Sequence, residues 1–562
     1  MNELTGASAL VLLLQKQGVK TIFGLCGDTS LPFYDALHQL DHGMRHILTR
    51  DERSAGYMAD VYARVSGTTG VCEGPSGGGA TYMTPALVEA NDSSSPIVAI
   101  TSDVSVGSRG RYPLTELNQE ALYQPLTKWN TVLNNAEQIP HSVRRAFNTA
   151  TSGKPGSVHL GFPIDVQRAP VNSDDLWADP SSLSYPSRRV SPDPAAIDKA
   201  AEILAGASRP VIVVGGGVVI SSAFDELAEL AEKIAAPVLC SVSGKGALAD
   251  THPLMAGAVG SNGGTNETRA IVAGADVIVF VGCRAGSVTT ERWRHPAPGK
   301  CRVIHLDIDS DVVGVSYFPD AALIGDAKLA LANLTDAVKK ADADALALAK
   351  GIVSRSKAAR RARLDQLADS MERPIRPERL VRSLNRLLPN DAVLVLDPGT
   401  PCPYFTAYYD LATPGRHIVT NRAHGALGYS LPGVVGAQFA RPDSKCVAVM
   451  GDGSFGFSVG EMETIVRYQL PITLVVVANS TYGWIKAGQK TSFGERYYSV
   501  DFTMSEHARI GEAFGLKSWR VEDPGALDQV LREAIAFDGP TLVEVVSQPL
   551  HEAAAPVSEW IA

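Results

Sequence analysis

Short apolar runs alternate with helical patterns along nearly the whole chain. Amphipathic stretches such as AAIDKAAEILAGA (195–207) and FDELAELAEKIA (224–235) lie between the apolar runs. Seven runs have the length and composition of buried parallel strands: SVHLGF (157–162), PVIVVGGG (210–217), DVIVFVGC (276–283), CRVIHLDID (301–309), DAVLVLD (391–397), CVAVMGDG (446–453) and ITLVVVAN (472–479). This alternation predicts an α/β protein built from doubly wound parallel sheets.

Two segments interrupt the alternation and predict domain boundaries. Residues 170–194 are rich in Ser, Pro and Asp, and residues 339–377 form an Ala- and Arg-rich helical stretch that ends in ERPIRP. They divide the 562 residues into three parts, each of ordinary domain size. We expect an N-terminal domain over 1–175, a central Rossmann-like domain over 190–345 and a C-terminal domain over 370–550.

The composition argues against several classes of function. The formal charge of -9 gives no basic footprint for nucleic acid and no polybasic patch for an anionic membrane. No apolar run approaches the ~20 residues of a spanning helix, and the start, MNELTGASALVLLLQKQG, predicts an amphipathic helix and not a signal peptide. The seven cysteines are scattered and never form a C-x-x-C pair, which predicts free thiols in a reducing cytoplasm.

Two polar residues end consecutive predicted strands in the C-terminal part. Asp452 follows one strand between two glycines, and Asn479 ends the next strand. Because the carboxyl ends of parallel strands meet at one edge of a sheet, the carboxylate and the amide oxygen are expected to converge. Hard oxygen ligands of this kind suit Mg²⁺ or Ca²⁺, with phosphate oxygens in the remaining positions. Gly451 and Gly453 would let the backbone approach a diphosphate closely.

The stretch 457–469 connects these two strands. Met462, Ile465 and Val466 share one helical face, so the stretch predicts a crossover helix.

The GDGS of 451–454 followed by Asn479 resembles the thiamine diphosphate (ThDP) motif of the acetolactate synthase and pyruvate oxidase superfamily. That family usually has Asn-Asn at the second strand end, where this chain has Ala478-Asn479. Further stretches are similar to family segments: GLCGDTSLPFYDAL (24–37), TRDERSAGYMADVYARVSG (49–67), LTKWN (126–130), TSGKPGSVHLGFPIDV (151–166) and NRAHGALGYSLPGVVGAQ (421–438). The resemblance covers nearly the whole chain.

The resemblance implies a cofactor site with two ends. The N-terminal domain would bind the pyrimidine ring and the C-terminal domain the diphosphate. Asp452, Asn479 and the backbone carbonyl of Thr481 would hold Mg²⁺. The residues implied in ThDP binding are Glu52, Gly399, Thr400, Gly425, Leu427, Gly451, Asp452, Gly453, Ser454, Asn479, Thr481, Tyr482, Gly483 and Trp484.

Glu52 and Leu427 receive catalytic roles from the resemblance. Glu52 would bond N1′ of the pyrimidine, so that the cofactor's own 4′-amino group removes the C2 proton and forms a C2-ylide. Leu427 would lie beneath the cofactor and hold its two rings in a bent shape. The cofactor then serves as the electron sink for cleavage or formation of a carbon–carbon bond.

Four further residues are candidates on the substrate side. Asp28 and Thr29 follow the first strand, where the family has small apolar residues. His424 precedes Gly425 in the pyrimidine-side loop and could bond a substrate or the 4′-amino group. Glu495 follows the cofactor-binding strand and is a candidate for proton transfer.

The substrate side also departs from the acetolactate synthase pattern. Leu114 and Thr115 stand near the family's Phe-Gln pair, and Ser76 lies in a loop about two residues longer than the family's Ser-Gly-Pro-Gly. ThDP chemistry is therefore better supported by the sequence than condensation of pyruvate.

The central domain has glycine-rich strand ends where relatives bind FAD or ADP. Asp307 and Asp326 would contact a ribose or an adenine there. The pattern leaves FAD, ADP and an empty site open, because such strand ends are common in Rossmann-like domains.

The leading hypothesis is a ThDP- and Mg²⁺-dependent enzyme, acetolactate-synthase-like, that decarboxylates or ligates 2-oxo acids. A 2-hydroxyacyl-CoA lyase, an oxalyl-CoA decarboxylase type and a benzaldehyde-lyase-type acyloin lyase are alternatives. A catalytically silent nucleotide-binding protein is an alternative of another class. The resemblance also implies a homodimer or homotetramer, because family members complete each site with two subunits.

Overall fold

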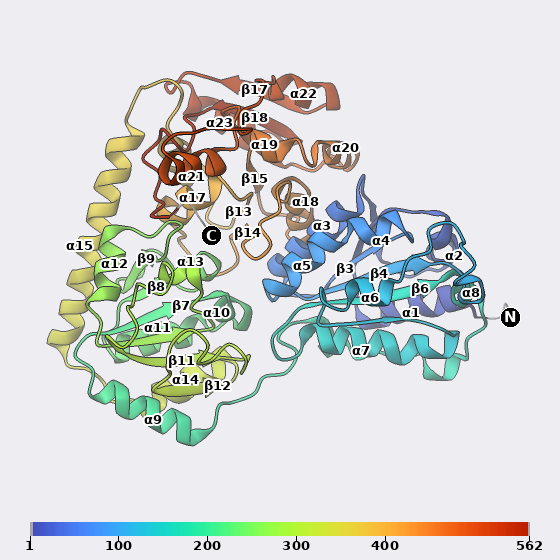
Figure 1. The fold of residues 1–562 in the computed structure, drawn as a ribbon, viewed down its shortest axis with the longest axis horizontal. Coiled ribbons are helices and arrows are strands. Elements are labelled where there is room, and N and C mark those ends of the chain that lie inside the picture. The colour runs from blue at the N-terminus through green and yellow to red at the C-terminus, as the bar shows by residue number, and fades with distance from the viewer. Residues whose placement is uncertain (1–3, 560–562) are drawn as a thin grey trace. The chain divides into compact units, whose positions relative to one another are not determined.

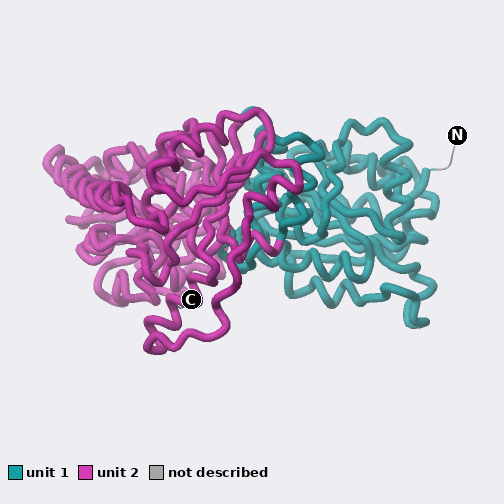
Figure 2. Tube along the Cα trace, turned by 90° about the horizontal axis from the view of Figure 1, so that it is seen from above, with its two compact units in different colours: residues 1–188, 421–443, 458–470 teal, residues 189–420, 444–457, 471–562 magenta. Residues whose placement is uncertain are grey.

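A computed structural model describes residues 4–559. The described chain forms two compact units (Figure 2). Unit 1 contains residues 1–188, 421–443 and 458–470, and unit 2 contains residues 189–420, 444–457 and 471–562.

Unit 1 is built on a six-stranded parallel sheet (Figure 1). The strand order is β2-β1-β3-β4-β6-β5, and every strand pair is parallel. The strands are β1 (Thr21–Gly24), β2 (Arg45–Leu48), β3 (Gly70–Gly74), β4 (Ile97–Asp103), β5 (Trp129–Val132) and β6 (Ser157–Pro163). The helices are α1 (Gly6–Gln17), α2 (Leu31–Gln39), α3 (Glu52–Ser66), α4 (Gly78–Tyr82), α5 (Thr84–Asp92), α6 (Gln119–Tyr123), α7 (Ile139–Thr151), α8 (Ile164–Arg168), α18 (Ser430–Ala440) and α20 (Met462–Arg467).

The predicted first helix is α1, and its ends have clear local causes. The Thr5 hydroxyl accepts a hydrogen bond from the Ser8 N–H, which caps the amino end. Gly18 ends the helix at φ 95°, a left-handed conformation that suits glycine. The apolar side of α1 then packs into the core of the sheet, with Leu10, Leu13 and Leu14 buried.

Unit 2 contains two further six-stranded parallel sheets. The central sheet has the order β12-β11-β10-β7-β8-β9, and the other has β14-β13-β15-β16-β18-β17. The central strands are β7 (Pro210–Val214), β8 (Val238–Cys240), β9 (Met255–Ala258), β10 (Val277–Val281), β11 (Arg302–Asp307) and β12 (Ala321–Ile324). The strands of the other sheet are β13 (Val393–Leu396), β14 (Ile418–Thr420), β15 (Cys446–Gly451), β16 (Thr473–Ala478), β17 (Lys517–Val521) and β18 (Thr541–Val546).

The helices of unit 2 flank both sheets. They are α9 (Pro194–Ala205), α10 (Gly216–Ser221), α11 (Phe224–Lys233), α12 (Asn266–Ala273), α13 (Ser287–Thr290), α14 (Ala327–Ala337), α15 (Ala343–Ala368), α16 (Pro377–Leu387), α17 (Pro401–Tyr408), α19 (Asp452–Phe455), α21 (Gly483–Phe493), α22 (His507–Phe514) and α23 (Leu527–Ala536). The long helix α15 packs on α12 and β9 of the central sheet and on α16 and α17 of the other sheet.

These three sheets confirm the predicted α/β class and its doubly wound parallel architecture. All seven apolar runs singled out in the sequence contain a strand. The strands of the three sheets span residues 21–163, 210–324 and 393–546. The three domain boundaries themselves stay predictions.

One predicted element differs. The stretch 457–469 was expected as one crossover helix, and the structure has a short 3-10 turn over Val459–Glu461 followed by α20. The Glu461 side chain accepts hydrogen bonds from the Arg50 N–H and the Thr464 hydroxyl, which places this segment in unit 1. Met462 and Ile465 are buried as the helical face predicted.

Helices α3 and α18 cross very closely within unit 1. A Cβ built on Gly436 would lie 2.1 Å from the Met58 carbonyl oxygen, so only glycine permits this approach. Beside the crossing, the rings of Tyr57 and Tyr429 meet edge to face at 5.1 Å. Residues nearly 400 positions apart in the sequence thus form one core.

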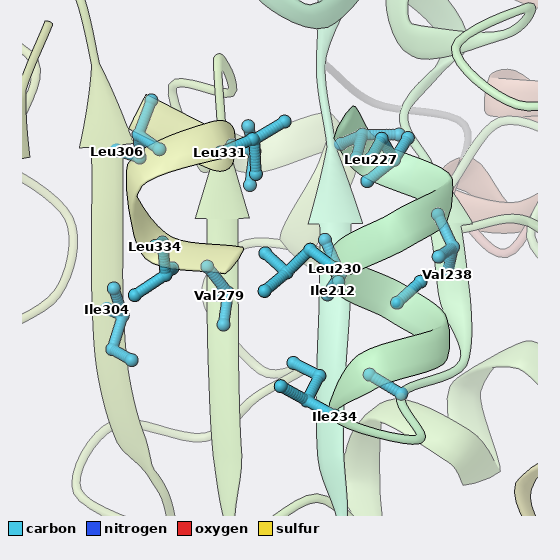
Figure 3. Close-up of a cluster of buried hydrophobic side chains, with 14 of the residues drawn as sticks. Ile212, Leu227, Leu230, Ile234, Val238, Val279, Ile304, Leu306, Leu331 and Leu334 are labelled. Carbon is cyan, nitrogen blue, oxygen red and sulfur yellow. The ribbon is translucent and has the colours of Figure 1, made fainter. Parts of the chain in front are cut away.

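The core of the central sheet shows why these sequences fold as layers (Figure 3). Leu227 and Leu230 of α11 and Leu331 and Leu334 of α14 lie over the strands. Ile212, Val279 and Ile304 come from three neighbouring strands and are fully buried with them. Burial of such side chains contributes about 1.5–3 kcal/mol each.

Among residues 4–559, no helix is both long and apolar enough to cross a membrane.

We expect Leu331→Ala to lower the free energy of unfolding by about 2–5 kcal/mol, because it leaves a cavity beneath α14. Leu348→Ala is the matched control, since Leu348 is 59% exposed on α15. The measurement is the denaturant midpoint of the circular dichroism signal. Equal midpoints for the two variants would contradict the packing described here.

Candidate active site

The ends of three neighbouring strands of unit 2 carry most of the predicted cofactor residues. Strands β13, β15 and β16 are adjacent, and Gly399–Thr400, Asp452 and Asn479 follow them. This is the carboxyl edge, where open parallel sheets bind ligands.

Asp452 joins two of these strand ends directly. Its Oδ2 accepts hydrogen bonds from the backbone N–H groups of Asn479 at 2.7 Å and Ser480 at 2.6 Å. Its Oδ1 accepts one from the Gly453 N–H at 2.9 Å. Both lone pairs of Oδ2 are therefore used, whereas Oδ1 keeps one lone pair for a further partner.

Burial raises the pKa of the Asp452 carboxyl, and the three backbone N–H groups oppose this rise. Positive charge beside such a buried carboxylate would stabilise its ionised form. A cation is the simplest source of that charge.

Asn479 offers the second predicted metal ligand. Its Oδ1 is buried, and within residues 4–559 it has no hydrogen-bond partner. An unsatisfied buried amide oxygen is unusual in a native fold and calls for an ion or water. The carbonyl of Thr481 accepts one hydrogen bond, from the Gly483 N–H at 2.9 Å, and has a second lone pair left. The donor set is thus three oxygens, and it fits Mg²⁺.

The two glycines beside Asp452 have different surroundings. A Cβ on Gly451 would meet no atom within 4 Å, which leaves open space for a ligand. A Cβ on Gly453 would lie 2.7 Å from the ring of Tyr482, so Gly453 is needed for packing against that ring. The structure adds this reason to the close approach of a diphosphate expected from the sequence.

The remaining predicted residues of this half-site are distributed as follows. Ser454 is buried in α19, Gly399 has φ 94° with open space beside it, and Thr400 precedes α17. Tyr482 precedes α21, which begins at Gly483 and Trp484. Glu495 lies beyond α21 with φ 61° and is exposed.

Glu52 occupies the carboxyl edge of the sheet of unit 1. It is the first residue of α3, after Asp51 caps the helix by accepting the Arg53 N–H. Only 7% of Glu52 is exposed. A Cβ on Gly74 would lie 3.2 Å from its Cγ, and a Cβ on Gly79 would lie 3.0 Å from its Oε1. Two glycine-lined backbone segments therefore make room for this carboxyl.

Burial raises the pKa of Glu52, and the negative charges of Asp51 and Glu73 raise it further. A carboxyl in this setting keeps a proton more readily than an exposed one. Perturbed carboxyls of this kind are typical of functional sites.

Glu73 was not singled out in the sequence, although it is an acidic residue inside an apolar strand, VCEG. It is buried, and its Oε1 accepts a short hydrogen bond from the Tyr34 hydroxyl. The same hydroxyl lies 3.0 Å from Nε2 of His46. Burial raises the pKa of Glu73, and the bonds to His46 and Tyr34 oppose the rise. Glu52 thus has a second buried carboxyl as its neighbour.

The loop 421–428 is held by one carboxylate. Glu89 of α5 accepts the backbone N–H groups of Arg422, Ala423 and His424 at 3.1, 3.1 and 2.7 Å. Arg64 of α3 also donates to Glu89 at 3.2 Å. The backbone of this loop is therefore fixed, while the His424 side chain is exposed.

Leu427 and Gly425 lie in the same loop. Leu427 is half-buried, and Gly425 has φ 73° with no atom within 4 Å of a built Cβ. After the loop, the Tyr429 hydroxyl donates to Asp60 of α3 at 2.5 Å. No local sequence pattern indicated that Glu89 binds this loop or that Asp60 binds Tyr429, because the partners are distant in the chain.

Asp28 and Thr29 follow β1 on the same edge as Glu52. Asp28 is exposed and Thr29 is partly buried. A Cβ on Gly27 would lie 2.4 Å from Cβ of Pro75, so the loops after β1 and β3 are in contact. The structure therefore brings Asp28, Thr29 and Glu52 to one edge of one sheet.

Asp326 of the central domain, a candidate for binding a nucleotide, has a structural role. Its carboxylate caps α14 by accepting the Lys328 and Leu329 N–H groups, pairs with Arg189 at 2.8 Å and accepts the Ser221 hydroxyl. Asp307 accepts the Asp309 N–H at 3.0 Å. The predicted contact between Asp326 and a nucleotide does not fit this arrangement, because the carboxylate is already used.

Comparison with known proteins finds the domains of one enzyme family along the chain. Three family models match the chain: the N-terminal TPP binding domain over residues 4–122, the central domain over 197–334 and the C-terminal TPP binding domain over 397–545 of thiamine pyrophosphate enzymes.

Curated relatives match along almost the full length. A probable acetolactate synthase large subunit of Methanocaldococcus jannaschii is 33% identical, over 97% of this chain and 92% of the relative. Acetolactate synthase isozyme 2 large subunit of Escherichia coli is 32% identical, over 96% of this chain and 95% of the relative. Acetolactate synthase isozyme 3 large subunit of the same organism is 30% identical, over 95% of this chain and 93% of the relative. The chain therefore belongs to the thiamine pyrophosphate enzymes and is an acetolactate-synthase-like, ThDP-dependent enzyme.

Proposed function

We propose that this enzyme uses ThDP and Mg²⁺ to cleave or form a carbon–carbon bond next to a carbonyl, with a 2-oxo acid as substrate. The observation that carries the proposal is the pairing of Asp452 with the end of β16, beside the unpartnered Asn479 oxygen. The acetolactate synthases among the relatives support the 2-oxo acid.

In unit 2, Asp452 Oδ1, Asn479 Oδ1 and the Thr481 carbonyl would hold Mg²⁺. The diphosphate would be surrounded by residues at three strand ends and at the start of α21. These are Gly399, Thr400, Gly451, Ser454, Tyr482, Gly483 and Trp484. ThDP, when bound, would supply a nucleophilic carbon and an electron sink for the reacting carbonyl.

In unit 1, Glu52 would hold a proton at N1′ of the pyrimidine. Its burial and its raised pKa favour this role, since a carboxyl must keep and release a proton near neutral pH. Leu427 would support the cofactor from below, beside Gly425. His424, Asp28, Thr29 and Glu495 remain candidates for contact with the substrate.

Several alternatives differ in substrate. A 2-hydroxyacyl-CoA lyase, an oxalyl-CoA decarboxylase type and an acyloin lyase would use the same Glu52 and Asp452. A panel of 2-oxo acids, acyloins and 2-hydroxyacyl-CoAs, read by product mass, separates them. FAD in the central domain is tested by the flavin absorbance of the purified protein, and ADP stays a candidate for the same place. The cytoplasmic location stays a prediction from the scattered cysteines.

Glu52→Gln is expected to slow deuterium exchange at C2 of bound ThDP by about 10²–10⁴-fold, because the amide cannot give or take the N1′ proton. The measurement is proton NMR of the cofactor after acid quench. Glu202→Gln, an exposed change on α9, is the control. Unchanged exchange in Glu52→Gln would remove Glu52 from the mechanism.

Asp452→Asn is expected to weaken Mg²⁺ binding by about tenfold or more, because an anionic oxygen ligand is lost. Titration of Mg²⁺ at fixed ThDP, followed by circular dichroism, gives the affinity. The exposed Asp443→Asn serves as the control. If both variants bind Mg²⁺ equally, Asp452 is not a ligand.

We further infer a homodimer or homotetramer in which Glu52 of one copy serves ThDP held by Asp452 of another. Co-expression of Glu52→Gln chains with Asp452→Ala chains tests this. Random dimers would recover about a quarter of wild-type activity, since half of them carry one intact site. No recovery, although mass spectrometry shows mixed dimers, would mean that each copy completes its own site.

A further inference from the structure

Four side-chain hydroxyls form a row along the carboxyl edge of the sheet of unit 1. Thr29 follows β1, Ser76 follows β3 and Ser102 lies at the end of β4. These three strands are neighbours in the order β1-β3-β4. Thr115 adds the fourth hydroxyl from the loop before α6.

The row is continuous. The Thr29 hydroxyl lies 2.7 Å from the Ser102 hydroxyl and donates to Ser76 at 3.0 Å. Ser76 lies 2.6 Å from the Thr115 hydroxyl. Thr115 donates to the carbonyl of Leu114.

One direction of the protons along the row satisfies all of these contacts. A carbonyl can only accept, so the Thr115 proton is committed to Leu114 and Thr115 must accept from Ser76. Ser76 then has no proton left for Thr29 and accepts from it, as the geometry also requires. Thr29 in turn accepts from Ser102 and from the Ser76 N–H at 3.1 Å.

The row therefore offers acceptor lone pairs and no donors. Each hydroxyl has one proton and two lone pairs. Three of the four protons are used between the hydroxyls, and the Thr115 proton is used by the Leu114 carbonyl. Ser76 and Ser102 are buried, whereas Thr115 at one end is exposed. Asp28, next to Thr29, is also exposed, and its carboxylate can only accept.

Thr115 is held in a strained conformation. Its φ of 69° lies in the left-handed region, which is costly for a β-branched residue. A Cβ on Gly77 would lie 2.8 Å from Cβ of Thr115, so the glycine provides the space for this residue. Such strain is typically kept at functional sites.

The row belongs to the edge that carries Glu52. Ser76 and Gly77 form the turn that precedes α4, and Gly79 lies in the first turn of α4. A Cβ on Gly79 would lie 3.0 Å from Oε1 of Glu52. A substrate brought to the cofactor beside Glu52 would thus approach this row of hydrogen-bond acceptors.

We propose that the Thr115–Asp28 side of the site selects a hydroxylated substrate, an aldehyde or 2-oxo acid with a free hydroxyl next to the reacting carbonyl. The hydroxyl donates to the exposed acceptors, and a substrate without it leaves them unpaired. This inference rests on the proposed function.

The test compares kcat/KM for hydroxypyruvate and pyruvate, and for glycolaldehyde and acetaldehyde, on the ThDP- and Mg²⁺-loaded full chain. Each pair differs by one hydroxyl. The hydroxylated member is expected to be preferred about tenfold or more. Thr115→Ala is expected to bring this ratio close to one, whereas Thr115→Ser, which keeps the hydroxyl, retains it.

Asp28→Asn is a second variant that avoids the strained loop. The amide of Asn adds N–H donors beside the row. The ratio of kcat/KM between the hydroxylated and the unhydroxylated substrate is therefore expected to fall. Deuterium exchange at C2 of bound ThDP is measured alongside. Absent exchange in the wild type overturns the proposed function. If C2 exchange is normal, three results overturn the proposed selection. They are equal kcat/KM values within each pair, a preference for the substrate without the hydroxyl, and turnover of neither substrate.

Discussion

The carboxylate of Asp452 is the contact on which the proposed diphosphate site depends. It draws the backbone N–H groups after β16 toward the end of β15, so the two neighbouring strands end at one point. Parallel pairing brings both ends to the same edge, and the hydrogen bonds fix their register there. The link holds the backbone of Asn479 and Ser480, which lies directly before the Thr481 carbonyl. One side chain thus acts both as a structural clamp and as a candidate ligand, which explains why it is buried despite the cost in desolvation.

The sequence was sufficient for the repeated architecture and for the polar strand ends. Apolar runs of strand length recur with helical stretches between them, and this periodicity is a local property that a single chain displays. Asp452 and Asn479 were found for the same reason, since each interrupts an apolar run at its carboxyl end. Glu52 was found only through its resemblance to a family segment, because an acidic residue at a helix start is otherwise an ordinary feature.

The supporting contacts could not be predicted, because they join residues that are far apart in the chain. Glu89 fixes the loop at 422–424, and Asp60 bonds Tyr429, each across more than 300 positions. Nothing in the local pattern of α3 or α5 shows which acidic residue will face solvent and which will be buried. The crossover helix at 457–469 was mispredicted for a similar reason. Its apolar face was correct, but the bond from Glu461 to the Arg50 N–H draws its first turn into unit 1.

The close crossing of α3 and α18 bears on how the polypeptide is made. Gly436 and Tyr429 pack against a helix that leaves the ribosome more than 360 residues earlier. During translation, α18 cannot cover the apolar side of α3 until the chain has passed Ala440. Long-range contacts of this kind slow folding. A nascent chain with such an exposed face is a natural client of chaperones. The core around the first sheet therefore cannot be complete before α18 has been synthesised.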